Sequence, residues 1–156
     1  MALRNTPVLV LDPETSVILF PKAPDGKALE RELIRLLKKY LTIRHNWEPL
    51  TIEDQSKKAS FFVASEFREK YLLSSQEQIR LSKEKQVAQR LFADDPDIDI
   101  KNKKATVRAE RILIINGIRA SQQMLFELSF DYGERTVNNP EGIYITGEKL
   151  TTSTGG

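Results

Sequence analysis

The chain has 156 residues, a formal net charge of +2 and no cysteine. This length predicts one domain. The near balance of 24 basic and 22 acidic residues gives too little positive charge to indicate a nucleic-acid partner by itself. The lack of cysteine excludes disulfides, thiolate zinc sites and cysteine nucleophiles. No apolar run is long enough to cross a membrane and the first residues do not resemble a secretory signal, so we expect a cytoplasmic protein, or a virion protein if viral, without membrane contact.

The N-terminal third predicts a hairpin followed by a helix. The apolar runs Val8–Leu11 and Val17–Phe20 flank Asp12-Pro13, which suits a turn, so they are expected to pair. A helix is predicted to open at Asp25-Gly26, to cover one face of a sheet and to end before Pro49. Its apolar residues recur at helical spacing: Leu29, Leu33, Leu36, Leu37 and Tyr40.

The stretch between Thr51 and Ala93 fits two interpretations. Its large apolar residues form a helical stripe, but part of the same stretch also alternates as a strand would, so whether residues 57–71 are helix or strand stays open, with helix favoured. The stripe consists of Ala59, Phe62, Val63, Phe67 and Tyr71. Ser74 and Glu77 have capping-box spacing, which predicts a new helix that starts near Ser75, is very polar from Gln76 to Gln89 and is ended by Asp94-Asp95-Pro96-Asp97.

The clearest pattern lies between Lys101 and Tyr132. Two runs, Ala105–Ile118 and Gln122–Asp131, are predicted to pair antiparallel. Two connections fit: a tight turn at Asn116-Gly117, where both residues tolerate positive φ, or a longer loop that uses the residues up to Gln123. Period-two spacing in the second run predicts one buried face: Met124, Phe126, Leu128 and Phe130.

A last strand is predicted after a polar loop, with Ile143 and Ile145 on one face. Residues 1–150 are expected to form a single α+β domain, and residues 151–156 a disordered tail. Because strands and helices segregate along the chain, the predicted fold is an antiparallel sheet of about five strands with a helical insert covering one face.

Catalytic and metal-binding candidates are few. His45 is the one histidine, and a lone histidine at a helix end is more often structural than a general base. Asp95, Asp97 and Asp99 have the spacing that begins an EF-hand loop, but Ile100 stands where that loop needs glycine. No glycine-rich phosphate loop or nucleophile elbow occurs. The sequence therefore predicts no enzyme activity, no catalytic residue, no cofactor and no metal.

By elimination, we predict a non-catalytic structural or assembly subunit of a larger multi-protein complex, such as a phage-like virion component. It would act through protein partners or self-association. The predicted contact residues are Trp47, Arg80, Lys83 and Arg90. The alternative is a nucleic-acid-binding accessory protein that contacts phosphates through the basic strand around Lys101–Arg111. Its candidate residues are Lys101, Lys103, Lys104, Arg108 and Arg111.

Overall fold

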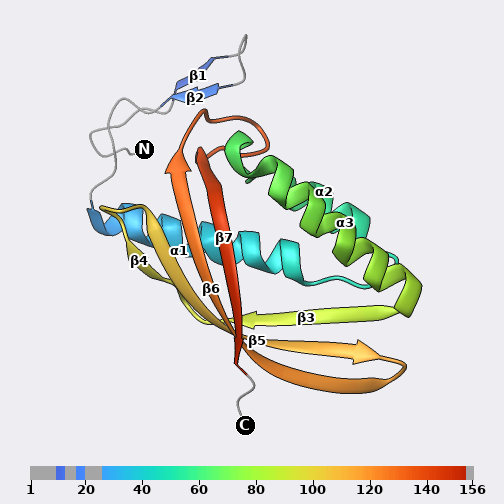
Figure 1. The fold of residues 1–156 in the computed structure, drawn as a ribbon. Helices are drawn as coiled ribbons and strands as arrows, with labels where there is room; N and C mark the ends of the chain where they lie inside the picture. Colours follow the sequence, from blue (N-terminus) through green and yellow to red (C-terminus); the bar gives the residue numbers. More distant parts are fainter. Residues whose placement is uncertain (1–9, 13–16, 20–25, 154–156) are drawn as a thin grey trace.

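A five-stranded antiparallel sheet carries the helices on one of its faces, as the computed structural model shows (Figure 1). The structure describes residues 10–12, 17–19 and 26–153. The sheet contains β3 (Val87–Ala93), β4 (Asp97–Asp99), β5 (Lys104–Ile115), β6 (Ile118–Tyr132) and β7 (Ile143–Ser153). The helices are α1 (Gly26–His45), α2 (Ile52–Ser60) and α3 (Arg68–Lys85), with a short 3-10 turn, η1 (Ser65–Phe67), before α3. This arrangement confirms the predicted α+β class.

The strand order is β3-β5-β6-β7, and β4 pairs with β5 on the same side as β3. All of these pairings are antiparallel. No helix among the described residues is long and apolar enough to span a membrane.

The predicted N-terminal hairpin is present as a separate two-stranded sheet. Strand β1 (Val10–Asp12) pairs antiparallel with β2 (Val17–Leu19), which confirms the pairing for these residues. The connecting residues 13–16 and the outer ends of both predicted runs lie outside the described residues.

The central hairpin formed by β5 and β6 is confirmed, and its turn is the tight one. Asn116 and Gly117 have φ values of 52° and 79°, as a two-residue hairpin turn of type I′ requires. The longer loop is wrong, because β6 begins at Ile118 and continues without a break through Gln123. From Met124 onward alternate residues of β6 are buried, so the predicted core face is also confirmed.

Helix α1 begins at Gly26 and ends at His45, before Pro49, as predicted. It packs across the inner face of the sheet, and its buried residues join those of β5, β6 and β7 in one core. Burying each leucine of this stripe stabilises the fold by about 2 kcal/mol. The residues of α1 that face this core are Leu33, Leu36, Leu37, Tyr40 and Leu41.

The region between α1 and β3 follows neither of the two predicted patterns. Helix α2 ends at Ser60, and the residues after it approach the sheet, where Val63 forms an isolated parallel bridge with Ile145. A continuous helix through residues 57–71 is therefore wrong, although every residue of the apolar stripe is buried. The break has a physical reason: Ala64 N–H donates to the Ile145 carbonyl (2.8 Å), and Ile145 N–H donates to the Phe62 carbonyl (2.7 Å).

The predicted helix start at Ser75 is wrong, since α3 begins at Arg68 and Ser74 lies inside it. The Ser74 hydroxyl donates to the Tyr71 carbonyl one turn earlier (3.0 Å) rather than capping a new helix. The helix also ends earlier than predicted, at Lys85, because Gln86 adopts a left-handed conformation with φ of 54°.

Two strands follow where the sequence predicted the end of the polar helix and a loop. In β3, the side chains of Val87, Gln89 and Leu91 are buried in alternation, and Asp97–Asp99 forms β4. The last strand, β7, extends through Ser153, so Thr151 and Thr152 are strand residues rather than part of a tail. Residues 154–156 lie outside the described part of the chain.

Candidate functional site

A β-bulge in β7 turns the Glu148 side chain, which is 7% exposed, toward the helices. Ser129 pairs with Gly147, but the next residue of β6, Phe130, pairs with Ile145, so Thr146 is left without a partner. This extra residue changes the phase of the alternation. Ile145 faces the helices, and so does Glu148 three residues later.

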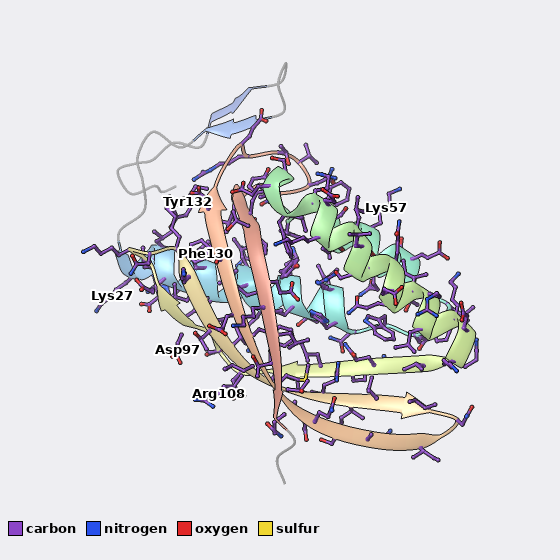
Figure 2. The ribbon with its side chains drawn as sticks, in the orientation of Figure 1. Lys27, Lys57, Asp97, Arg108, Phe130 and Tyr132 are labelled. Atoms are coloured by element: carbon purple, nitrogen blue, oxygen red, sulfur yellow. The ribbon has the colours of Figure 1, made fainter. Side chains whose placement is uncertain are left out.

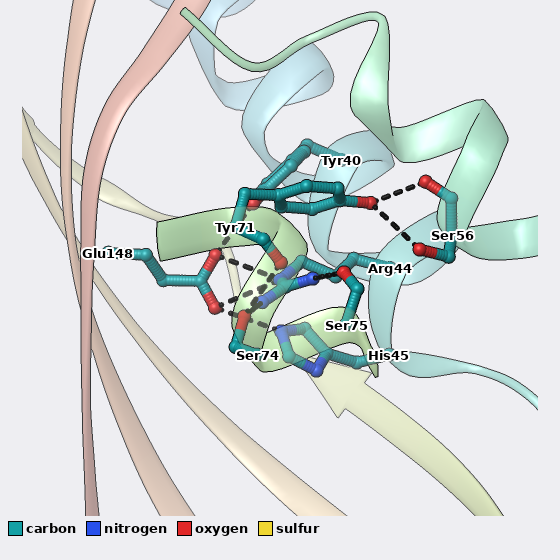
Figure 3. Close-up of polar contacts among 8 residues, drawn as sticks. All are labelled: Tyr40, Arg44, His45, Ser56, Tyr71, Ser74, Ser75 and Glu148. Atoms are coloured by element: carbon teal, nitrogen blue, oxygen red, sulfur yellow. Dashed lines mark hydrogen bonds and ion pairs between the residues drawn. The ribbon is translucent and has the colours of Figure 1, made fainter. Parts of the chain in front are cut away.

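The Glu148 carboxylate accepts hydrogen bonds from three side chains of α1 (Figure 3). The Tyr40 hydroxyl donates to Oε1 at 2.7 Å, and Arg44 Nε donates to the same oxygen at 3.2 Å. Nε2 of His45 lies 3.1 Å from Oε2. The three donors lie within the last two turns of α1, so one carboxylate joins the first long helix to the last strand.

Helix α3 encloses the same group of side chains. Arg44 donates through Nη2 to the Ser74 hydroxyl (2.8 Å) and through Nη1 to the Ser75 hydroxyl (3.2 Å). Its guanidinium also lies 4.4 Å from the centre of the Tyr71 ring, close enough for a cation–π contact. The Tyr71 hydroxyl donates in turn to the Ser56 carbonyl on α2 (Figure 3). All three helices and β7 therefore meet at one polar cluster, which we call the Glu148 cluster: Tyr40, Arg44, His45, Tyr71, Ser74, Ser75 and Glu148.

Burial and neighbouring charges act against each other in this cluster. Burial by itself would raise the pKa of Glu148, but the hydrogen bond from His45 and the charge of Arg44 outweigh it and hold the pKa at about 2. Burial lowers the pKa of His45 in spite of the bond to Glu148. At neutral pH we infer an ionised Glu148 paired with charged Arg44, and a neutral His45 that donates its Nε2 proton to the carboxylate.

The geometry of the Glu148 cluster is that of a structural ion pair. The side chains of His45 and Glu148 expose only 4% and 7% of their surface, so a substrate cannot reach this acid and base. The interpretation of His45 as structural fits this burial. His45 also packs against Phe126, with ring centres 5.0 Å apart. No group of three or more His, Asp or Glu side chains in the described part of the chain could hold a metal ion.

Of the four predicted contact residues, one is buried and three are exposed. Trp47 is 3% exposed and packs with Ile52 and Val87, so its side chain offers no contact surface in the monomer. The other three are exposed cations that pair with nearby acids. Arg80 binds Glu77 and Glu84 along α3, Lys83 binds Glu53, and Arg90 lies 3.6 Å from Glu48. Their role as an interface stays a prediction.

The basic residues proposed for nucleic acid are also divided. Lys104 and Arg108 lie on the sheet face away from the helices, and Arg108 is seen there in Figure 2. Lys103 is held by Asp131 at 2.8 Å. Arg111 lies on the opposite face of β5, half-buried, and donates to Gln122. Lys101 lies in the turn before β5. The five side chains thus form no continuous basic surface.

The Glu148 cluster was missed by the sequence analysis. Tyr40 was found only as part of an apolar stripe, and Arg44 and Glu148 carried no motif. The local pattern points the wrong way, because Glu148 follows Ile145 at an odd spacing of three residues, which predicts an outward-facing side chain in a regular strand.

Comparisons with known proteins find similar folds among solved structures. No protein-family model matches the sequence, and no curated protein matches it. Among solved structures, the Agrobacterium tumefaciens VirB8 protein superposes with a TM-score of 0.70 at 17% identity, covering 86% of this chain and 99% of that one. The soluble domain of TrwG, from the type IV secretion machinery of Bartonella grahamii, superposes with a TM-score of 0.66 at 16% identity, covering 83% of this chain and 97% of that one. The periplasmic domain of DotI superposes with a TM-score of 0.62 at 14% identity, covering 84% of this chain and 98% of that one.

These neighbours change the two expectations about where the protein is located. They include a domain of secretion machinery and a periplasmic domain, so they support neither the virion nor the cytoplasm as the place of this chain. The chain spans nearly the full length of each compared domain. What it shares with them is the α+β architecture of VirB8 and similar secretion-component domains.

Proposed function

We propose that this protein is a non-catalytic assembly subunit of a bacterial type IV secretion machine, with the domain described here on the periplasmic side. The observation that carries the proposal is the superposition on VirB8 over 99% of that chain, because a match of this extent includes the whole domain rather than one motif. Fold alone does not determine function. The proposal therefore also rests on how the chain's own chemistry is arranged.

That arrangement favours a scaffold over an enzyme. The groups that could transfer protons, His45 and Glu148, are enclosed and hold the helices to the sheet. The exposed residues instead include large apolar side chains that a subunit would cover in a complex, such as Leu73 on α3 and Phe92 on β3. We propose that the protein acts through copies of itself and through other secretion components.

Deletion of the gene in its host tests the proposal. Transfer of a type IV secretion substrate is expected to be lost and to be restored by the wild-type chain. A matched control is Lys57→Ala, since Lys57 is exposed on α2 (Figure 2) and should restore transfer equally well. A deletion strain that transfers substrate at the wild-type rate would overturn the proposal.

The assembly role has a second readout. A photo-crosslinking residue in place of Leu73 or Phe92 is expected to capture other components of the secretion machine in intact cells. The same residue in place of Lys57 is the control. If neither position captures a secretion component while the protein is expressed and folded, the assembly role is wrong.

A further inference from the structure

The two edges of the five-stranded sheet differ in how they are closed. On β3, Gln89 and Trp47 exchange backbone hydrogen bonds of 2.8 and 3.1 Å in the middle of the strand. On β7, the segment around Val63 forms backbone hydrogen bonds with the outer edge only at Ile145. Beyond that point, no other described segment donates to or accepts from the outer backbone edge of residues 146–153. An open edge of this kind is a template for another strand.

The tight central turn determines which backbone groups face that edge. In a two-residue hairpin the flanking residues, Ile115 and Ile118, form a hydrogen-bonded pair. Because hydrogen-bonded and non-hydrogen-bonded pairs alternate, the even-numbered residues of β6 direct their backbone N–H and C=O groups toward β5. The odd-numbered residues, including Leu125, direct theirs toward β7. Leu125 pairs with Thr151. The N–H and C=O of Thr151 therefore point inward, to β6.

The neighbours of Thr151 consequently point the other way. Leu150 and Thr152, and by the same alternation Glu148, direct their N–H and C=O groups to the open edge. Ile145 gives an independent check. It pairs with the even-numbered Phe130, so the rule predicts that its backbone groups point outward. They do, because they bond to the segment around Val63.

We propose that this edge pairs antiparallel with the same edge of a second copy of the chain, with Leu150 opposite Leu150 of the second copy. In this register Glu148 of each copy lies opposite Thr152 of the other copy. Three outward donors from each copy then give about six intermolecular hydrogen bonds, and each outward group finds a partner. The inference deepens the proposed function, on whose self-association it rests, by naming the surface where two copies meet.

The side chains fit this register. Leu150, which is 40% exposed in the monomer, would be covered by its counterpart. Lys149 would face Thr151 of the second copy, so no like charges oppose each other. The Glu148 side chain is already paired inside its own copy and brings no free charge to the interface. Thr151 and Thr152 are β-branched and suited to a strand at the centre of a sheet.

The cysteine-free sequence allows a direct test with Leu150→Cys in the full chain. The proposed register places the two Cα atoms about 5.5 Å apart, within the range of a disulfide. Mild oxidation is expected to produce a covalent dimer, detected by non-reducing electrophoresis and mass spectrometry. Thr151→Cys is the matched control, because this residue faces Lys149 of the second copy and not itself. Efficient cross-linking of T151C in place of L150C would overturn the register.

A second pair of variants tests the hydrogen bonds. Thr152→Pro removes one outward donor from each copy and leaves the bonds to β6, whereas Thr152→Val keeps the amide and the branched shape. Sedimentation equilibrium is expected to show a dimer dissociation constant about 10- to 100-fold higher for T152P than for T152V. Circular dichroism checks that both are folded.

The failure of this inference differs from the failure of the proposed function. If the wild-type protein dimerises but L150C does not cross-link, or if T152P dimerises as well as T152V, the interface lies elsewhere and the secretion role stands. A wild-type protein that stays monomeric at millimolar concentration also overturns the pairing. The transfer assay decides the secretion role separately.

Discussion

Nε2 of His45, at the end of the first long helix, lies 3.1 Å from Oε2 of Glu148, in the last strand and 103 residues away in the sequence. Both side chains are buried, and Arg44 binds the same carboxylate. The helices are therefore held to β7 by an ion pair as well as by apolar packing.

Replacing Glu148 with glutamine is expected to lower the free energy of unfolding by about 3–5 kcal/mol, because Arg44 would stay buried without a counter-charge. The shape of the side chain and an acceptor for Tyr40 are kept, so the loss reports mainly the charge. Urea denaturation measures it. Glu127→Gln, on the exposed face of β6, is the control and should change stability by less than about 0.5 kcal/mol. A similar small loss for E148Q would show that the ion pair does not stabilise the fold.

Stability is expected to fall in acid in two stages. The pKa of Glu148 is about 2 in the folded protein against an ordinary value of 4.5. Its contribution of about 3 kcal/mol is therefore complete above pH 4.5 and is lost as the pH falls toward 2. The pKa of His45 is also lowered from its ordinary 6.5, so the folded state binds fewer protons there too, and the decline begins below about pH 6.5.

Denaturation curves between pH 8 and pH 2 measure this dependence. In His45→Gln the first stage should disappear, and in E148Q the second should disappear. If the wild-type protein and both variants have parallel profiles, other groups control the acid response.

Deleting Thr146 is expected to leave the protein folded. Without the bulge residue, Ile145 and Glu148 are two positions apart, and both still face the helices by simple alternation. Deleting Gly147 together with Thr146 should instead turn Glu148 toward the open face, since Ile145 and Glu148 then become neighbours and adjacent strand residues point to opposite faces. We expect this double deletion to cost about 3–5 kcal/mol, as loss of the ion pair does. Equal stability of the two variants would contradict this account of the bulge.

Reversing the charge of Lys83 and Arg90 tests the contact surface predicted from the sequence. K83E/R90E is expected to lose cross-links to other secretion components while self-association through β7 stays unchanged, because both side chains are exposed and lie outside that edge. Sedimentation equilibrium and photo-crosslinking from Phe92 measure the two effects. A variant that keeps all cross-links would show that these cations are only solvated surface.

Much of the fold could be predicted because its signals are local. Asn116-Gly117 and the period-two runs beside it predict the central hairpin, and the helical spacing of leucines predicts α1. Strand β3 could not be found in this way. Its buried face includes Gln89, whose amide donates to the His45 carbonyl (2.9 Å), so a polar residue there hides the alternation. The break after Ser60 depends on a bridge to β7, which no local pattern contains.

The Glu148 cluster was beyond prediction for a related reason. Arg44 and Glu148 are ordinary surface residue types, and only the bulge at Thr146 turns the carboxylate inward. Bulges disrupt the period on which strand prediction depends. His45 was noticed as the one histidine, and its structural interpretation fits the site, but its partner could not be named from the sequence.

The long sequence separation of the Glu148 cluster also bears on synthesis of the chain at the ribosome. Arg44 and His45 emerge early, whereas their carboxylate emerges only after about a hundred further residues. Until then, closing α1 onto the central hairpin would bury a guanidinium with no counter-charge. Nascent chains stalled before β7 should therefore remain open to protease and to chaperones, and stable folding should begin only when residue 148 leaves the exit tunnel.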